Sequence, residues 1–295
     1  MGKTGKKGQA GKPKKLTPKG IGKRLDALVK KLEEELKDAD LFAALLPTED
    51  CPICFVPFPP VKSGTFYQAC CGNEICLACY KENKLSINKQ NEKNASKKVE
   101  LTCPFCREQA PTSDELFARL QARCLQNDYN AFSMMGKRYR TGAIDVPKDD
   151  LKALDCYIRA VELGSPESCT RIGFIYDKGI GLAIDKERAT LFQRVGALRG
   201  DIIARHNIGC AEYSSGNHET AIRHWKIAAE AGYQKSLDAL REIYNSNGKF
   251  SGKEFITKEY LDSAYRACHE AQMEVKSEER DKHTTKKVQK SSRNS

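Results

Sequence analysis

Apolar residues near the start of the chain follow a helical period. They recur at spacings of three and four residues, with lysine and glutamate between them, at Ile21, Leu25, Leu28, Val29, Leu32 and Leu36. This spacing is typical of an amphipathic helix. The apolar stretch LFAALLP extends the pattern until Pro47 stops it, so we expect one helix over residues 21–46. The pattern fits packing on the rest of the chain and pairing with another chain equally well.

The second half of the chain, from Ser113 to about Met273, is helical throughout, and its pattern repeats. Two series of glycines mark the repeat: Gly136, Gly173 and Gly209 are 37 and 36 residues apart, and Gly164, Gly200 and Gly232 are 36 and 32 residues apart. Small residues recur at two further positions, and an aromatic residue at a third: Ala153, Ala189 and Ala221; Ala160, Gly196 and Ala228; and Tyr157, Phe192 and Trp225. Small residues let two helices approach closely while the aromatic rings fill the space between layers. The sequence therefore predicts a helix–turn–helix unit of about 36 residues.

The stretch YDKGIGLAIDKERA, between the two helices of one unit, resembles the Sel-one-like repeat, a relative of the tetratricopeptide repeat. A fourth, weaker unit runs from Tyr233 to about Gln272, and the helix from Ser113 is expected to cap the other end. The resemblance implies an all-α solenoid over residues 112–275. Such stacks present a concave surface for a peptide or a protein.

Cysteines are concentrated in the first half, where eight of the thirteen lie between residues 51 and 106. They form four couples: Cys51 and Cys54, Cys70 and Cys71, Cys76 and Cys79, and Cys103 and Cys106. Three couples have the two-residue gap that lets one tight turn present two thiolates to one zinc ion. Eight thiolates supply two tetrahedral sites, and no histidine can replace one, since all five lie at or beyond position 206. Two structural zinc ions are therefore expected, rather than eight free buried thiols.

Cys70 and Cys71 are adjacent, which raises the question of whether both bind metal. Sulfurs at neighbouring tetrahedral corners lie about 3.8 Å apart, the same as adjacent α-carbons. Successive side chains of an extended strand point in opposite directions, so the backbone must kink here. Gly72 directly after the couple permits a kink, and we expect both cysteines to be ligands.

The order of the couples resembles the RING finger in its all-cysteine variant, over residues 47–110. The resemblance implies interleaved ligands, with Cys51, Cys54, Cys76 and Cys79 on a first zinc and Cys70, Cys71, Cys103 and Cys106 on a second. A plant-homeodomain finger would need a histidine ligand and a tryptophan, and a FYVE finger would need an Arg–His–His–Cys motif. Neither is present here. The finger has few apolar residues, with Phe58, Phe66, Tyr67 and Ile75 as its candidate core, so metal binding is expected to supply much of its folding free energy.

RING fingers perform no covalent chemistry; the resemblance implies that this one binds a ubiquitin-conjugating enzyme. Ile53 stands at the apolar position inside the first couple, and Pro104 follows the seventh ligand. Arg107, after the last ligand, matches the cationic residue that contacts both enzyme and ubiquitin, a role that suits the planar guanidinium. Leu85, on the expected central helix, completes this contact set.

Charge is concentrated at the two ends of the chain. Of the net +11, residues 1–24 carry nine basic side chains and no acid, and residues 276–295 carry seven basic and three acidic ones. We expect basic disordered tails at residues 1–20 and 276–295, which are solvated or serve as a nuclear address or a loose RNA contact. No run approaches the roughly 18 apolar residues of a membrane span. A cytoplasmic or nuclear protein with reduced thiols and no membrane partner is therefore expected.

The sequence thus favours a mostly α protein, with a small zinc-stabilised α+β RING domain followed by a helical-repeat solenoid. The first functional hypothesis is a ubiquitin ligase that recruits a conjugating enzyme through the RING and a protein substrate through the repeats. The alternative is a noncatalytic adaptor with a structural zinc domain, and an RNA-associated factor acting through the tails is a third.

Overall fold

The computed structural model describes residues 16–43, 45, 49–59, 64–93, 99–143, 146–246, 249–250, 253–254 and 256–274. Nearly all of the two expected basic tails lies outside these ranges, and residues 18–20 prove to be helical. None of the helices in the described ranges combines the length and the apolar character that a bilayer crossing requires.

The described chain is mostly helical, as predicted, with a small sheet in the cysteine-rich part. In the first half the elements are α1 (Pro18–Leu36), β1 (Thr65–Tyr67), β2 (Glu74–Cys76) and α2 (Leu77–Lys93). Strands β1 and β2 pair antiparallel with Phe66 opposite Ile75. In the second half they are α3 (Ser113–Leu125), α4 (Tyr129–Thr141), α5 (Asp150–Glu162), α6 (Pro166–Lys178), α7 (Lys186–Leu198), α8 (Ile202–Ser214), α9 (His218–Glu230), α10 (Gln234–Asn245), β3 (Lys249–Phe250), β4 (Lys253–Glu254) and α11 (Lys258–Glu274).

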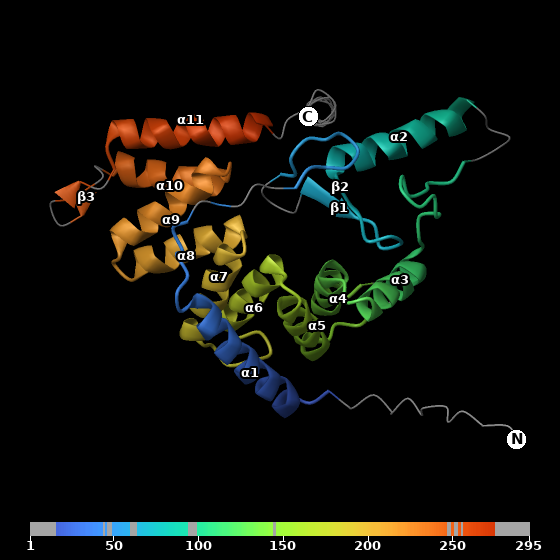
Figure 1. Cartoon of the computed structure of the whole chain (residues 1–295), viewed down its shortest axis with the longest axis horizontal. Coiled ribbons are helices and arrows are strands. Elements are labelled where there is room, and N and C mark those ends of the chain that lie inside the picture. Colours follow the sequence, from blue (N-terminus) through green and yellow to red (C-terminus); the bar gives the residue numbers. More distant parts are fainter. Residues whose placement is uncertain are drawn as a thin grey trace, which may run out of the picture.

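The helices of the second half stack into an arc. The closest pairs are α4 with α5, α6 with α7, and α8 with α9, and each pair also packs on the next. Figure 1 shows the arc running from α3 and α4, below the small sheet and α2, to α10 and α11 at the opposite end. The predicted helix–turn–helix unit is therefore the building block of this half.

Close approach within a pair depends on the first glycine series. A β-carbon on Gly136 would lie 2.6 Å from the ring of Tyr157, and one on Gly209 would lie 2.5 Å from the indole nitrogen of Trp225. Such distances are well inside van der Waals contact, so only glycine lets these aromatic rings lie flat on the first helix. In the middle unit, Gly173 instead faces Gln193 and the backbone of Ala189.

The second glycine series ends the second helix of each unit. Gly164, Gly200 and Gly232 have φ values of 99°, 94° and 88°, the left-handed region in which glycine lacks the steric penalty of other residues. The backbone N–H just after each glycine donates to the carbonyl of the recurring small residue Ala160, Gly196 or Ala228, at 2.9, 2.8 and 3.0 Å. The sequence period therefore reflects one turn geometry used three times.

Helix α1 differs in its bounds from the expected helix over residues 21–46. It begins at Pro18, where the Thr17 side chain caps it, and it ends at Leu36. After Leu36 the chain turns. In the turn, the Asp40 carboxylate accepts a hydrogen bond from the Phe42 backbone N–H at 2.8 Å. The segment then packs on α8 and α9 through Leu41 and Phe42. Tertiary contacts therefore override the helical pattern of LFAALLP, of which residues 44 and 46–47 lie outside the described ranges.

The apolar face of α1 packs on its own chain, against α5 and α7. Leu25 and Leu32 are 1% and 0% exposed there. Ion pairs flank the contact, with Arg24 bound to Asp155 and Arg199 bound to Glu35 at 2.7 Å. Of the two open alternatives, packing on the chain itself is the one observed (Figure 1, lower edge).

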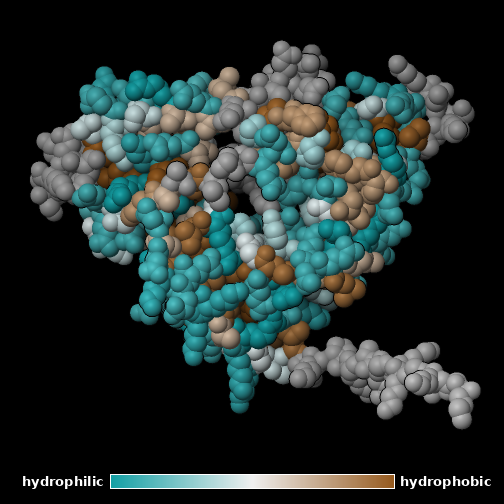
Figure 2. All heavy atoms as spheres, viewed as in Figure 1, coloured by the Kyte–Doolittle hydropathy of each residue, from teal (hydrophilic) through white to brown (hydrophobic). Residues whose placement is uncertain are grey.

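Both ends of the stack have the expected helices. At one end, α3 starts at a capping box formed by Thr112 and Glu115 and packs on α4. At the other, α10 and α11 form the fourth unit, with the β3–β4 hairpin between them. The face of the molecule seen in Figure 2 is mostly hydrophilic with separated apolar patches, which agrees with a core held within and between the helix pairs.

Candidate metal centres

Two short loops of the same design carry four of the cysteines. In the first, the Cys51 N–H donates to the Val56 carbonyl at 3.0 Å and the Phe55 N–H donates to the Cys51 carbonyl at 2.8 Å. The second repeats both bonds, from Cys103 to Glu108 at 2.7 Å and from Arg107 to Cys103 at 3.1 Å. We call these loops, residues 51–56 and 103–108, the two knuckles. Each presents two thiols on the same side of a tight turn.

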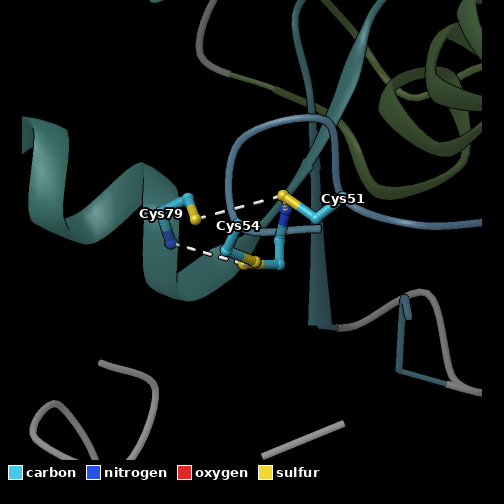
Figure 3. A group of neighbouring side chains, drawn as sticks. Cys51, Cys54 and Cys79 are labelled. Carbon is cyan, nitrogen blue, oxygen red and sulfur yellow. Dashed lines mark hydrogen bonds between the residues drawn. The ribbon is translucent and has the colours of Figure 1, made fainter. Parts of the chain in front are cut away.

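The first knuckle meets the end of β2 and the start of α2, where Cys76 and Cys79 lie. All four sulfurs, including those of Cys51 and Cys54, lie within 4.8 Å of one another. The Cys51 and Cys79 sulfurs are 4.0 Å apart, and Figure 3 shows them pointing toward each other from the knuckle and the helix. Cys51, Cys76 and Cys79 are buried. This cluster is the first metal group.

The second knuckle meets the adjacent cysteines on the turn between β1 and β2. Cys70, Cys71, Cys103 and Cys106 also have their sulfurs within 4.8 Å of one another, and those of Cys71 and Cys103 are 3.8 Å apart. This cluster is the second metal group. The two groups divide the eight cysteines as the interleaved RING pattern implies.

The kink that adjacent ligands require is present at Gly72. Its φ is 81°, in the left-handed region. The N–H groups of Cys71 and Gly72 both donate to the Gln68 carbonyl, at 3.2 and 2.7 Å, and close a tight turn. The turn brings both side chains to one side, where an extended strand would send them apart.

The sulfur spacing fits a tetrahedral metal ion and not disulfides. All thirteen cysteines are free thiols, and the sulfur separations of 3.8 to 4.0 Å within the groups are about twice an S–S bond length. A zinc ion with Zn–S bonds of about 2.3 Å would hold its sulfurs about 3.8 Å apart. The donor set of each group, four thiols and no other side chain, is that of a structural zinc site.

The proton affinities of these thiols also favour a bound cation. Burial raises the pKa of Cys79, and the neighbouring thiols of Cys76, Cys54 and Cys51 raise it further. Burial likewise raises the pKa of Cys70, with added contributions from Cys106 and Cys103. Crowding therefore disfavours ionisation of all four thiols together, and a divalent ion held at either group would supply the compensating charge.

Donor groups around the sulfurs favour the thiolate form. Although burial acts in the opposite direction, backbone N–H groups, that of Cys76 first, lower the pKa of Cys51 to about 7. The Cys76 N–H lies 3.4 Å from the Cys51 sulfur, and the side-chain amide of Asn73 donates to the Cys71 sulfur at 3.2 Å. Such outer contacts orient the ligands of metal sites. Asn73 could not be identified from the sequence, because its contact with Cys71 depends on the turn.

The four residues expected to contact a conjugating enzyme all have solvent access. Ile53 is 40% exposed and Arg107 is exposed, each on the outside of a knuckle. Leu85 on α2 and Pro104 are half-buried. Solvent can therefore reach all four residues.

Phe55, an exposed residue of the first knuckle, was not predicted from the sequence as a contact residue. Phe55 is 77% exposed and has a φ of 54°, and Arg107, at the equivalent position of the second knuckle, has a φ of 64°. Left-handed backbone costs a non-glycine residue about 1 kcal/mol, so glycine would suit both positions better. Aligning CPICF with CPFCR would have identified Phe55 as the counterpart of Arg107.

The cysteine-rich part is joined to the helical half through Tyr67 at the end of β1. Its phenol donates to the Asp128 carboxylate at 2.6 Å, and Arg123 binds the same oxygen at 2.7 Å. Ala69, which is 6% exposed, packs beside Leu120 of α3. Tyr67 was expected in the finger core, but it lies in this interface, whereas Ile75 and Phe58 form that core at 0% and 9% exposure.

The fold and the site define a helical-repeat scaffold joined to a cysteine-rich part with two candidate metal centres. The repeats are Sel1 repeats: the family named "Sel1 repeat" matches residues 133–165, 166–190 and 206–233. These matches fall on the α4–α5, α6–α7 and α8–α9 pairs. Sel1 repeats generally mediate protein–protein interaction, so this half is a protein-interaction scaffold. No RING family matches the cysteine-rich part.

Individual relatives are similar to this chain over only part of each chain's length. A putative sel1-like repeat-containing protein of Acanthamoeba polyphaga mimivirus is 30% identical over 105 residues, which is 36% of this chain and 20% of the viral protein. The crystal structure of a Sel1 repeat protein from Oxalobacter formigenes is 28% identical, with a TM-score of 0.47, over 54% of this chain and 65% of that one. A protective antigen of uropathogenic Escherichia coli strains, described as displaying an SLR fold, is 18% identical with a TM-score of 0.46, over 65% of this chain and 40% of that one. The chain thus spans a fifth of the length of the viral relative.

Proposed function

We propose that this protein is a zinc-binding ubiquitin ligase of the RING type. Its cysteine-rich part would hold two zinc ions and recruit a ubiquitin-conjugating enzyme, and its Sel1 repeats would bind the protein substrate. The observation that carries the proposal is the division of eight cysteines into two interleaved four-thiol groups. That division brings the two knuckles, with Ile53 and Arg107 on their outer surface, into one small domain.

The zinc ions would be structural, held by Cys51, Cys54, Cys76 and Cys79 in one group and by Cys70, Cys71, Cys103 and Cys106 in the other. Bound zinc supplies the charge that lets the thiols ionise together and fixes the knuckles relative to α2. The protein's own residues would do the rest. Ile53, Leu85 and Pro104 would form the apolar contact with the enzyme, and the guanidinium of Arg107 would donate hydrogen bonds to the enzyme and the carried ubiquitin.

Ubiquitin transfer by the purified full chain, with a broad panel of conjugating enzymes, tests this proposal. We expect self-ubiquitination with at least one enzyme and a loss of about ten-fold or more in Arg107→Ala, because a charge-assisted contact made during transfer is removed. Arg266→Ala, an exposed arginine of α11, is the matched control and should keep full activity. If wild type and Arg107→Ala are equally inactive with every enzyme, the ligase proposal is wrong.

The second candidate function is a noncatalytic adaptor, which the Sel1 match alone already supports. In that case the zinc domain would bind a protein partner without recruiting a conjugating enzyme. Full zinc loading together with inactivity across the panel would favour the adaptor, since it separates metal binding from transfer. Location in the cytoplasm or nucleus is part of both proposals and is tested by imaging the tagged full chain.

A further inference from the structure

The turn that follows α1 docks on the Sel1 repeats as a bound peptide would. The Leu41 carbonyl accepts a hydrogen bond from the guanidinium of Arg205 on α8. The ring of Phe42 lies between two residues of α9, with its centroid 4.7 Å from that of His224 and 3.7 Å from the guanidinium carbon of Arg223. Figure 1 shows this part of the chain, in blue, rising from α1 beside α8 and α9.

The surface on which the turn packs is cationic, and few of its positive groups have an acidic or hydrogen-bonding partner within the described ranges. Arg205 and His224 are 3% and 2% exposed. Arg205 also donates to the Ala197 carbonyl at 3.2 Å, but its Nε and the Nδ1 of His224 have no hydrogen-bond partner in the described structure. Among the described residues, no carboxylate lies within 4.0 Å of a guanidinium nitrogen of Arg194, Arg205 or Arg223.

The pKa directions agree with an excess of positive charge. Burial, together with the nearby Arg205, Arg223 and Arg194, lowers the pKa of His224 to about 4. Burial lowers the pKa of Arg205 as well, and Asp40 is the one group that acts in the opposite direction. A buried guanidinium with carbonyl partners and one distant carboxylate is unfavourable, and additional negative charge would stabilise it.

The segment of residues 38–42 that occupies this surface has a preformed turn, but its carboxylates offset only part of the positive charge of the surface. In the sequence DADLF, residues 38–42, the Asp40 carboxylate accepts from the Phe42 N–H at 2.8 Å, and the Ala43 N–H donates to the Asp40 carbonyl at 3.2 Å. Asp40 thereby preforms the turn that presents the Leu41 carbonyl and the Phe42 ring. Its side chain remains exposed, and it does not pair directly with Arg205.

We propose that this surface on α8 and α9 is a peptide-binding site for acidic turns that contain Asp–Leu–Phe, and that residues 37–43 occupy it within the chain. A partner protein with the same turn and more acidic residues around it would supply more negative charge beside Arg205 and Arg223 and would displace the resident segment. Such a partner would be the substrate of the proposed ligase. That consequence rests on the proposed function, whereas the binding itself does not.

Fluorescence anisotropy with the full chain tests the proposal. The probe is a labelled peptide of residues 37–43, together with a second peptide in which three glutamates precede Asp–Leu–Phe. Phe42→Ala in the chain should free the site, and both peptides should then bind at least ten-fold tighter than to wild type, because the tethered segment competes at high effective concentration. The glutamate peptide should bind the tighter of the two and lose more affinity with added salt.

Two variants in the Phe42→Ala background locate the site. Arg223 is exposed, so Arg223→Ala should fold normally and should weaken peptide binding about five-fold by removing the contact with the phenylalanine ring. Arg266→Ala on α11 is the matched control and should leave binding unchanged. A peptide with alanine in place of phenylalanine should not bind.

Three outcomes would overturn the proposal. The first is equal binding to wild type and Phe42→Ala, and the second is equal binding of the peptide that lacks phenylalanine. The third is a concentration-dependent dimer of wild type that is lost in Phe42→Ala, because the occupant would then be a second copy of the chain. Self-ubiquitination of the same variants separates the two proposals: absent peptide binding with retained activity refutes only this site, and tight binding without activity refutes only the ligase.

Discussion

At the scale of single residues, the backbone conformation at a few positions decides which cysteine sulfurs come together in each metal group. Cys70 and Cys71 reach one metal group because the turn at Gly72 has a φ of 81°. The sequence alone predicted this couple as ligands, from the count of thiols and from the glycine, and the structure places both sulfurs in one group. No feature of the sequence pointed to Asn73, whose amide donates to the Cys71 sulfur, because that contact exists only once the turn has formed.

The first prediction concerns Cys71 and Cys103 of the second group, whose sulfurs lie 3.8 Å apart. Cys71→Ser and Cys103→Ser should each lose one of two zinc ions, because a hydroxyl does not replace a thiolate in a four-sulfur site. Native mass spectrometry of the full chain counts the ions, and circular dichroism should show that the repeat helices remain. Cys210→Ser, an exposed thiol of α8, is the control and should keep both ions. Retention of both ions in Cys71→Ser would show that the grouping is wrong.

At the scale of elements, an aromatic ring lies against a glycine in two of the helix pairs, α4 with α5 and α8 with α9. The period of small and aromatic residues predicted these pairs well, because a repeated contact leaves a repeated sequence. The middle unit differs from the other two. Gly173 faces Gln193, although Phe192 is the recurring aromatic residue of that unit. Which neighbour a glycine meets depends on the rotation of the helices, and the period does not specify that rotation.

The second prediction compares two glycines that lie in helices. Gly209→Ala should destabilise the chain by about 1–3 kcal/mol, since the new β-carbon would lie 2.5 Å from the Trp225 ring. Gly22→Ala in α1 meets nothing within 4 Å and should stabilise the protein by about 0.5–1 kcal/mol through helix propensity. Urea unfolding followed by circular dichroism measures both changes. Equal effects of the two substitutions would contradict the close contact between Gly209 and the Trp225 ring.

At the scale of the whole molecule, the cysteine-rich part and the helical half form a continuous structure. Tyr67, Asp128 and Arg123 connect β1 to the start of α4, and Ala69 packs on α3. Hydrogen bonding by Tyr67 and Arg123 outweighs the effect of burial and lowers the pKa of Asp128 below its ordinary value of 3.8. The carboxylate therefore stays ionised and the connection persists at neutral pH. The metal groups should accordingly stabilise the adjoining end of the solenoid.

The third prediction concerns metal removal. Chelation should unfold the segment from β1 to α2, whose apolar core is small, because each zinc ion bound as proposed would contribute on the order of 10 kcal/mol to folding. Hydrogen–deuterium exchange should rise there and, to a smaller extent, in α3 and α4, while α9 and α10 stay protected. Global loss of protection would show that the repeats have no independent stability.

A conservative variant tests the connection with metal bound. Tyr67→Phe removes the hydrogen bond to Asp128. Hydrogen exchange in α3 and α4 should therefore become faster, by an amount that corresponds to about 1–2 kcal/mol of protection free energy, while both metals are retained. Tyr80→Phe keeps the stacked contact with Phe66 and serves as the control. Similar exchange in both variants would mean that Tyr67 does not couple the two parts.

The sequence by itself determined the local and repeated features of this protein. The 36-residue period, the glycines that end each second helix and the four cysteine couples are all readable because the residues that act together are close in sequence or recur at fixed spacing. The tertiary structure alone decided where α1 ends, that its apolar face packs on α5 and α7, and that Tyr67 faces the repeats. It also decided that Leu41 meets a buried arginine of α8 and that Phe42 meets Arg223 and His224 of α9. Each of these contacts joins residues far apart in the sequence, so no pattern along the chain could encode it.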